Sequence, residues 1–247
     1  KTHTKIALIV RKEKGRLRNY FHIGTGNYNS NTSRFYTDLG LLSTDPDIAS
    51  DLLELFNYLS GFSKQKSYQK LLVSPSSMRE KFIFLIKREI KNAEEGKKAE
   101  IIAKMNSLVD PEIIKLLYLA SEAGVKISLI IRGICCLYPQ RKNLSENIQV
   151  ISIIGHFLEH SRIFWFCNND EHEVFIGSAD WMRRNLDRRI EAVTPIEDYE
   201  LKSQLYSLLQ TYIKDDYFSW IMEEDGSYSK YALDSGGNRS QIDLIKK

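Results

Sequence analysis

The sequence is poor in cysteine, in net charge and in long apolar runs. Its cysteines are Cys135, Cys136 and Cys167, an odd number without a metal-binding spacing, which favours a protein of a reducing cytoplasm. The formal net charge of +3 is too small to indicate binding to nucleic acid or to a membrane, although local charge clusters can still bind polyanions. No apolar run reaches the roughly 18 residues that a membrane-spanning helix needs.

What the chain does contain is one motif that occurs twice. His3-Thr4-Lys5 precedes a strand-like run that ends in Ile23-Gly24-Thr25-Gly26-Asn27. His160-Ser161-Arg162 precedes another that ends in Ile176-Gly177-Ser178-Ala179-Asp180. A single His-x-Lys is more often a half-buried strand histidine without a function, but two copies in the same order favour two half-sites that face each other. Two histidines, two cations and backbone donors around one anion are the groups that transfer a phosphoryl group through a phosphohistidine.

The two motifs supply the candidate catalytic residues. His3 is the candidate nucleophile, because a neutral imidazole attacks phosphorus well and has a pKa near neutrality. His160 is its candidate partner for protonating the leaving oxygen or binding the phosphate, whereas the nearby His156 lacks the x-Arg continuation. Lys5 and Arg162 follow their histidines by two residues and so share a strand face with them. They are either cations for phosphate oxygens or exposed strand charges.

The small-residue turns suggest supporting residues. Asn27 and Asp180 end the turns, where an amide or a carboxylate can orient a histidine and glycine-rich backbone can offer N–H groups to an anion. His22 directly precedes the first turn and either supports the site or makes a structural hydrogen bond.

An arginine and an acidic residue also recur in each half. Arg34 is followed by Asp38, and Arg184 is followed by Glu191. This correspondence makes Asp38 a further candidate for supporting the site.

Other arginines of the second half suggest phosphate contacts. Arg132 closes a buried strand, and ligands gather at the carboxyl ends of parallel strands, so it is either a phosphate clamp or a salt-bridged strand end. A dense basic patch beside the second turn is either a solvated charge run or a path for a polyanion. The patch consists of Arg183, Arg184, Arg188 and Arg189.

The pattern of apolar residues and caps predicts an α/β fold. Asp45-Pro46 and Asp110-Pro111 are typical helix starts, and Gly61 and Gly124 are typical helix ends. A strand–helix–strand order around the second of these helices implies a parallel pair with a right-handed crossover. We expect the polar tail after Gly226 to lack a regular pattern and to be mobile. The expected strands cover residues 4–11, 17–23, 35–42, 101–105, 127–131, 148–153, 163–166, 174–176 and 190–193, and a last helix covers 199–213.

The repeat also predicts the domain organisation. Residues 1–70 form the remainder of a first catalytic domain, and residues 71–247 form a second one with the mobile tail. A strand–helix–strand unit precedes His160, but only two residues precede His3. We therefore expect the first domain to be truncated at its N-terminus and not to close a complete core alone.

These motifs resemble the C-terminal catalytic region of the bacterial polyphosphate kinase family, from Lys1 to about Tyr217. The resemblance implies two phospholipase D-like α/β domains related by pseudo-two-fold symmetry, with Arg162 in place of the usual lysine of the second motif, as in this family. It rests on His3-Thr4-Lys5, His22-Ile23-Gly24-Thr25-Gly26-Asn27, Tyr36-Thr37-Asp38, Arg132-Gly133, Glu159-His160-Ser161-Arg162 and Ser178-Ala179-Asp180-Trp181-Met182.

The resemblance implies reversible transfer of the ATP γ-phosphate to the end of inorganic polyphosphate through a phosphohistidine, with Mg²⁺. His3 matches the phosphorylated histidine, and His160 matches a second essential histidine that contacts nucleotide. Tyr36 and Arg132 match nucleotide-binding positions, and the basic patch fits the wall of a polyphosphate tunnel. The family's metal-linked residues lie upstream of Lys1, so no metal ligand is assigned in this chain.

The resemblance further implies ATP or ADP and polyphosphate as partners, no nucleic acid, and a homodimer or larger assembly of the complete protein. It implies a cytoplasmic location and leaves open a peripheral association with the inner membrane. One alternative is a phospholipase D-type phosphodiesterase, against which Arg162 and Tyr36-Thr37-Asp38 argue. Another is a fragment that binds polyanions or nucleotides and is inactive by itself.

Overall fold

A nine-stranded mixed sheet forms the centre of the computed structural model, which describes residues 1–62, 67–230 and 237–246. Its strand order is β14-β13-β8-β7-β6-β10-β11-β12-β5. The central strands β6 (Glu100–Met105), β7 (Lys126–Ile131) and β8 (Ile148–Ile153) are parallel, and all other neighbours are antiparallel. The other strands are β5 (Leu72–Ser74), β10 (Ile163–Phe166), β11 (Glu173–Gly177), β12 (Glu191–Ile196), β13 (Ser219–Met222) and β14 (Tyr228–Lys230).

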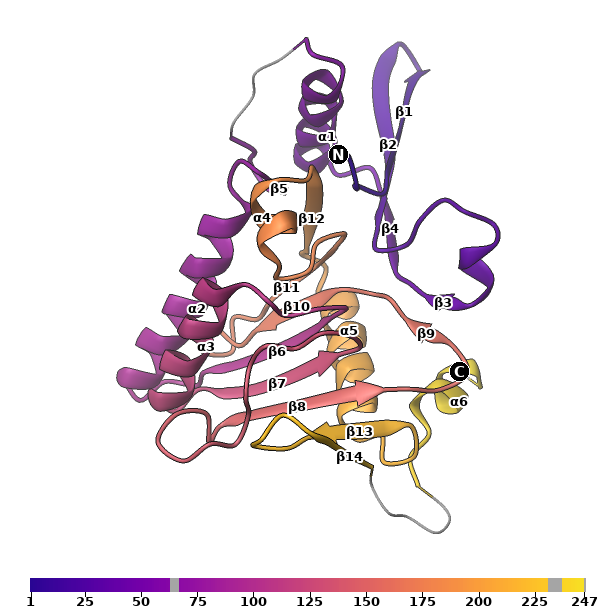
Figure 1. The fold of residues 1–247 in the computed structure, drawn as a ribbon. Coiled ribbons are helices and arrows are strands. Elements are labelled where there is room, and N and C mark those ends of the chain that lie inside the picture. The colour runs from indigo at the N-terminus through magenta and orange to yellow at the C-terminus, as the bar shows by residue number, and fades with distance from the viewer. Residues whose placement is uncertain (63–66, 231–236, 247) are drawn as a thin grey trace.

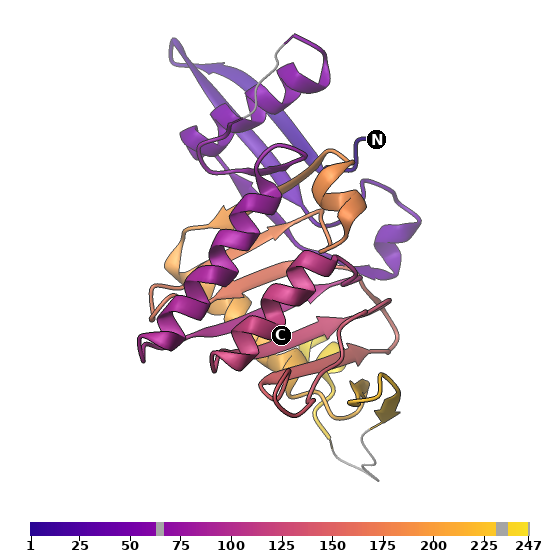
Figure 2. The ribbon, with the colours of Figure 1, turned by 60° about the vertical axis from the view of Figure 1, so that its left-hand side comes forward.

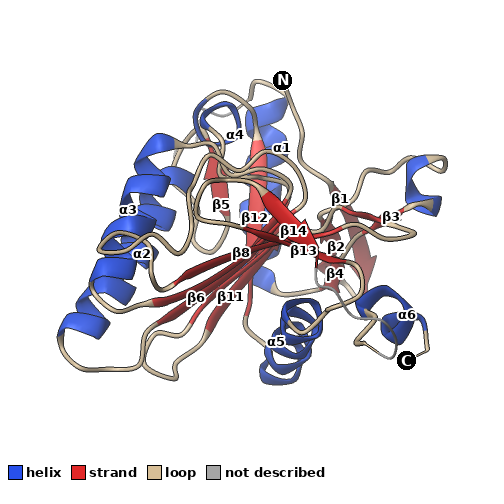
Figure 3. Cartoon of the chain, turned by 60° about the horizontal axis from the view of Figure 1, so that its bottom comes forward, coloured by secondary structure: helices blue, strands red, loops and turns tan. Residues whose placement is uncertain are grey.

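Helices cover both faces of this sheet. α2 (Met78–Glu94) and α3 (Pro111–Glu122) lie on one face, and α5 (Tyr199–Ile213) lies on the other (Figures 1 and 3). Asp110 caps α3 by accepting the backbone N–H groups of Glu112 and Ile113, and Gly124 ends it at a φ of +93°. The expected parallel strand–helix–strand unit is therefore confirmed. None of the helices in the described ranges has the length and apolar character that a membrane crossing requires.

A smaller antiparallel sheet comes from the N-terminal part of the chain. Its strands β1 (Ile6–Glu13), β2 (Arg16–Gly24) and β4 (Gly40–Ser43) are arranged in the order β1-β2-β4, and α1 (Pro46–Leu59) follows them. The same antiparallel order recurs in β10, β11 and β12 of the large sheet. His3 lies three residues before β1 and His160 three residues before β10, so the two halves repeat both motif and strand arrangement.

The single strand expected at residues 35–42 is wrong. After η1 (Thr32–Arg34), β3 (Tyr36–Thr37) leaves the small sheet and pairs in parallel with β9 (Leu158–Glu159) of the second half. The chain returns to the small sheet only at β4. The break carries Asp38 out of the small sheet and toward the second half.

The two halves share one of the three apolar cores. Phe21, Ile23 and Leu52 of the first half pack in a cluster with Val73 and Ala192, which belong to β5 and β12. The small sheet and α1 thus rest against the β12–β5 edge of the large sheet (Figure 2). The core of the first half is completed by residues that follow the expected boundary at residue 70.

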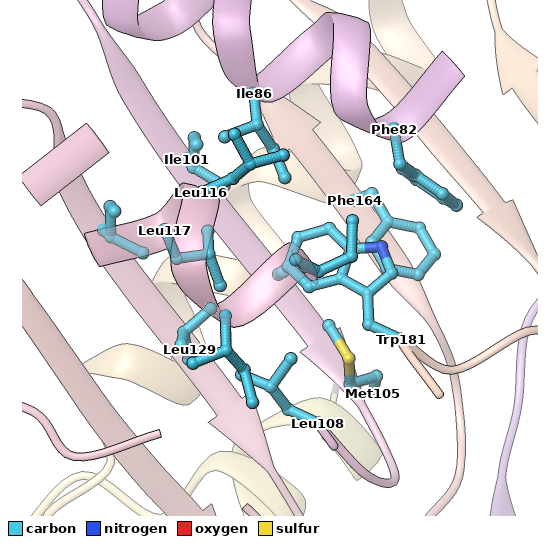
Figure 4. Packing of buried hydrophobic residues seen from close by; sticks show 14 of the residues in the cluster. Phe82, Ile86, Ile101, Met105, Leu108, Leu116, Leu117, Leu129, Phe164 and Trp181 are labelled. Atoms are coloured by element: carbon cyan, nitrogen blue, oxygen red, sulfur yellow. The ribbon is translucent and has the colours of Figure 1, made fainter. Parts of the chain in front are cut away.

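An aromatic cluster fixes the turn of the second motif. Phe82 of α2, Phe164 of β10 and Trp181 are fully buried, and their ring centroids lie 4.7 to 5.6 Å apart (Figure 4). Trp181 directly follows Asp180, so its burial holds that end of the turn against the sheet. Packing on the face of the sheet that α2 covers therefore positions Asp180, one of the expected site residues.

The tail after Gly226 differs from our expectation of no regular pattern. It contains β14, which pairs with β13, and α6 (Ser240–Ile245), whose residues Ser240 and Gln241 are buried. These residues are polar, so an apolar period could not reveal them. Residues 231–236 of the tail lie outside the described residues, and its mobility stays a prediction.

Phe82→Ala should lower the free energy of unfolding by about 3 to 5 kcal/mol, because it removes a fully buried aromatic side chain from this cluster. Phe84→Ala on the same helix is the control, since Phe84 is 56% exposed and its removal should cost far less. Urea unfolding of both variants measures the difference, and equal losses would contradict the packing described.

Candidate active site

His3 is oriented by a carboxylate of the second half. Its backbone N–H donates to the carbonyl oxygen of Ile190 at 2.9 Å, and its Nδ1 lies 2.9 Å from Oε2 of Glu191. Glu191 is the first residue of β12, has no exposed surface, and also accepts the hydroxyl of Ser178. Because the carboxylate accepts the Nδ1 proton, the neutral ring keeps its lone pair on Nε2.

His160 is oriented in the same way by a carboxylate of the first half. Its Nδ1 lies 2.8 and 3.0 Å from the two carboxylate oxygens of Asp38. The ring of Tyr36 packs against the imidazole at a centroid distance of 4.8 Å. Burial lowers the pKa of His160, and the cations Arg162 and Arg132 lower it further, whereas Asp38 opposes them. The histidine is therefore held neutral, with its Nδ1–H donating to the carboxylate of Asp38.

The two cations of the motifs lie between these crossed pairs. The buried ammonium of Lys5 donates to the carbonyl oxygen of His3, and it interacts electrostatically with both Glu191 and Asp38. Nη1 of Arg162 lies 2.9 Å from the carbonyl oxygen and 3.1 Å from Nε2 of His160. It also lies 3.3 Å from the carbonyl oxygen of Thr25, in the turn of the first motif. The structure thus brings both motifs into one site.

The pKa of Lys5 is lowered within this group of charges. Its burial lowers the pKa to about 8, Arg162 and Arg189 act in the same direction, and Glu191 and Asp38 act against them. The site therefore holds a lysine that loses its charge above about pH 8, in a position where an incoming anion would stabilise the charged form.

Asp180 has a different role from the one expected of it. It accepts Nε of Arg162 at 3.1 Å and the backbone N–H of Asn106 at 2.8 Å, so it orients the arginine and not a histidine. The side-chain oxygen of Asn106 accepts Nε of Arg132 at 2.9 Å. The sequence interpretation missed Asn106, although it directly follows β6 and lies beside the end of β7, which Arg132 directly follows, where ligands of parallel sheets gather.

Several expected site residues lie outside this group. Asn27 is exposed, unlike its buried counterpart Asp180. His22 is bonded through Nδ1 to the hydroxyl of Tyr28 at 2.6 Å, which is the structural alternative left open for it. Of the basic patch, Arg189 is half-buried and close enough to affect Lys5, whereas the rest is exposed. These exposed residues are Arg183, Arg184 and Arg188.

The carboxylates of the site do not form a magnesium site. Asp38 and Glu191 each bond a histidine, and Asp180 bonds an arginine. In the described ranges, the group of three metal-type ligands is Cys167, Asp170 and His172, beyond the opposite end of β10. A thiol and an imidazole suit softer metals than Mg²⁺, which prefers oxygen ligands. The residues present do not fit this cofactor.

Comparison with known proteins identifies the family. A model described as polyphosphate kinase C-terminal domain 1 matches residues 1–65, and one described as polyphosphate kinase C-terminal domain 2 matches residues 71–241. The chain belongs to the polyphosphate kinase family. The expected family and the mixed α/β fold are thereby confirmed.

The polyphosphate kinases that it matches are longer than this chain. It is 60% identical over 249 residues to the polyphosphate kinase of Parasynechococcus marenigrum, a match that covers 100% of this chain and 35% of the relative. Identity to the polyphosphate kinase of Pseudomonas aeruginosa is 45%, over 100% of this chain and 36% of that protein. The crystal structure of the polyphosphate kinase from Porphyromonas gingivalis has a TM-score of 0.92 and 38% identity, over 99% of this chain and 38% of that one. The chain thus spans about a third of these polyphosphate kinases.

The low pKa of Lys5 predicts a pH dependence of anion binding. Lys5 is charged below about pH 8 and neutral above it, so affinity for inorganic triphosphate should fall about tenfold between about pH 7 and about pH 9. Calorimetric titration across this range measures the fall.

Lys5→Arg is the matched control, because a guanidinium stays charged throughout the range. The variant should lose most of the pH dependence while still binding triphosphate. A fall of equal size in both proteins would show that another group controls it.

Proposed function

We propose that the complete protein transfers the γ-phosphate of ATP reversibly to the end of inorganic polyphosphate through a phosphohistidine on His3. The observation that carries this proposal is the pair of crossed histidine–carboxylate bonds, His3 with Glu191 and His160 with Asp38. These bonds support the proposal, because they orient two imidazoles close to two cations that can neutralise phosphate oxygens.

His3 is the better nucleophile of the two histidines. Its side chain is 23% exposed, against 9% for His160, and in the described part of the chain no hydrogen-bond partner faces its Nε2. Nε2 of His160, in contrast, faces Arg162 at 3.1 Å. The lone pair of His3 is thus available to an incoming phosphorus atom.

In the first step, Nε2 of His3 attacks the γ-phosphorus and forms a nitrogen–phosphorus bond. The bond from that phosphorus to the bridging oxygen breaks, and the oxygen leaves with the electron pair on ADP. The ring of His3 becomes cationic and keeps its proton on Nδ1. Glu191 stabilises this cation, because its buried carboxylate lies 2.9 Å from Nδ1.

In the second step, a terminal oxygen of polyphosphate attacks the phosphorus, and the nitrogen–phosphorus bond breaks with its electrons returning to Nε2. No net proton is consumed by His3, because the Nδ1 proton stays between the ring and Glu191 throughout. The same steps in reverse produce ATP from polyphosphate and ADP. Lys5 and Arg162 neutralise the non-bridging oxygens in both directions.

The other residues of the second half bind and position the substrates. Arg132 is held by Asn106 beside Arg162, where it can clamp nucleotide phosphates. His160, kept neutral by burial and by the neighbouring cations, contacts the transferring phosphate. Tyr36 packs on His160 and supports it at the nucleotide side.

His3→Ala should abolish transfer of radiolabel from γ-labelled ATP to the full-length protein, together with polymer synthesis, because it removes the attacking nitrogen. The label on the unaltered protein should be acid-labile and base-stable, as a phosphohistidine is. His156→Ala is the control, since His156 is exposed and packs only on Phe218 among rings.

A His3→Ala protein that is still labelled and still makes polymer would overturn the assignment. Hydrolysis of a phosphodiester by the unaltered protein without ATP, in the absence of labelling, would instead support a phosphodiesterase. Binding of ATP and polyphosphate without any turnover would support a binding function alone.

A further inference from the structure

A buried carboxylate joins the tail of the chain to the loop that holds His160. Glu159 directly precedes His160 and is 3% exposed. Its Oε2 lies 2.9 Å from Nζ of Lys104 and 2.8 Å from the hydroxyl of Thr37, and its Oε1 lies 2.7 Å from Nε2 of Gln241. The three donors come from β6, β3 and α6, which are distant in sequence.

The charge state of this carboxylate follows from these donors. Burial by itself would raise the pKa of Glu159, but Lys104, Gln241 and Thr37 together lower it. The carboxylate is therefore ionised and accepts all three donors. Hydrogen bonds to a charged group are stronger than those between neutral groups. Removal of one donor therefore changes the position of the carboxylate and its bonds to the other donors.

Thr37 links this hydrogen-bond network to the residues that contact His160. It lies between Tyr36, which packs on the imidazole, and Asp38, which accepts the Nδ1 proton. On its second-half side, the backbone pairing of this segment is the two-residue ladder of β3 with β9, and on its first-half side the hydroxyl of Thr25 bonds Asp38 at 2.6 Å. Because so short a ladder is weak alone, the side-chain bond from Thr37 to Glu159 strengthens the attachment of this segment to the loop of His160.

Gln241 is the residue that fixes Glu159 from the other side. Its amide also spans the backbone of Phe157, donating to the carbonyl oxygen at 2.9 Å and accepting the N–H at 3.0 Å. Its side chain is buried against Gly155, where an added Cβ would lie 2.3 Å from its Oε1. The amide is thus locked over residues 155–159, which lead directly into His160.

We propose that Gln241, in the C-terminal helix α6, is a positioning residue that acts through Glu159 and Thr37 to hold Asp38 and Tyr36 on His160. The inference rests on the proposed function, in which His160 takes part in phosphoryl transfer. It gives the polar tail a part in the reaction, although the tail contributes no residue that contacts the transferred group.

Gln241→Ala in the full-length protein tests the proposal. The charged and titratable groups that face His160 are Asp38, Arg162, Arg132 and Tyr36, and of these Asp38 raises the pKa of His160 while both arginines lower it. Loosening Asp38 should therefore lower the pKa of His160 further, as measured by NMR titration of isotope-labelled histidine. The kcat of transfer should fall about ten- to a hundredfold with a smaller change in KM, because a misplacement of about 1 Å is that costly.

Gly155→Ala is a second variant that keeps the proposal falsifiable. Its added methyl group would lie 2.3 Å from Oε1 of Gln241 and 3.1 Å from the ring of Phe218, so the flexible end of Gln241 has to move, whereas neither Lys104 nor Glu159 is altered. It should reproduce the shift of the His160 pKa and the fall in kcat with little change in thermal stability. Asp243→Ala is the matched control, since this exposed residue lies on the same helix and its carboxylate, among the described residues, accepts the backbone N–H of Arg239 at 3.3 Å and does not reach Glu159.

An unchanged pKa of His160 and an unchanged kcat in both folded variants would overturn the proposal. A fall in kcat that matches the loss of thermal stability, without a pKa shift, would assign Gln241 a structural role and would also overturn it. Failure of the proposed function has a different signature. The unaltered protein would then not be labelled on histidine, whereas the pKa of His160 would still report on Gln241.

Discussion

Each histidine of the site is held by a carboxylate from the other half of the chain, and the rest of the site depends on this exchange. Neither half contains both members of a pair: Glu191 orients His3, and Asp38 orients His160. Docking of the small sheet on β5 and β12 is therefore a condition for the arrangement of the site as well as for the fold. The shared core of Phe21, Val73 and Ala192 supplies the apolar burial that maintains it.

The balance of charge explains why the site is suited to an anion. Burial lowers the pKa of Lys5, and Arg162 and the nearby Arg189 lower it further by repulsion. Burial and repulsion by Arg162 likewise lower the pKa of Arg132. The facing carboxylates are each occupied by a histidine or an arginine, so they offset only part of this repulsion. A phosphate group that enters relieves the remainder, and the fixed cations do not have to reorganise when it does.

The repeat could be read from the sequence because each copy is local, with a histidine, a cation and a turn in one short segment. The caps at Asp45 and Asp110 likewise made α1 and α3 predictable. The partners of the histidines could not be assigned, because the two bonds join residues 188 and 122 positions apart. The separation of β3 from the small sheet and the presence of the helix α6 were missed for another reason. β3 and α6 are held by hydrogen bonds among Thr37, Glu159 and Gln241. Such bonds between polar residues produce no periodic pattern of apolar residues in the sequence.

The difference between Lys5 and Arg162 makes the two half-sites unequal. The flexible ammonium of Lys5 bonds the carbonyl oxygen of His3 and leaves Nε2 of that histidine free. The planar guanidinium of Arg162 has more donors in a fixed arrangement, so it reaches Asp180, the backbone of Thr25 and His160 at once. It thereby bonds Nε2 of His160, the ring nitrogen that corresponds to the nucleophile we propose in His3. In the function that we propose, this difference between the two cations makes His3, and not His160, the histidine that accepts the phosphoryl group.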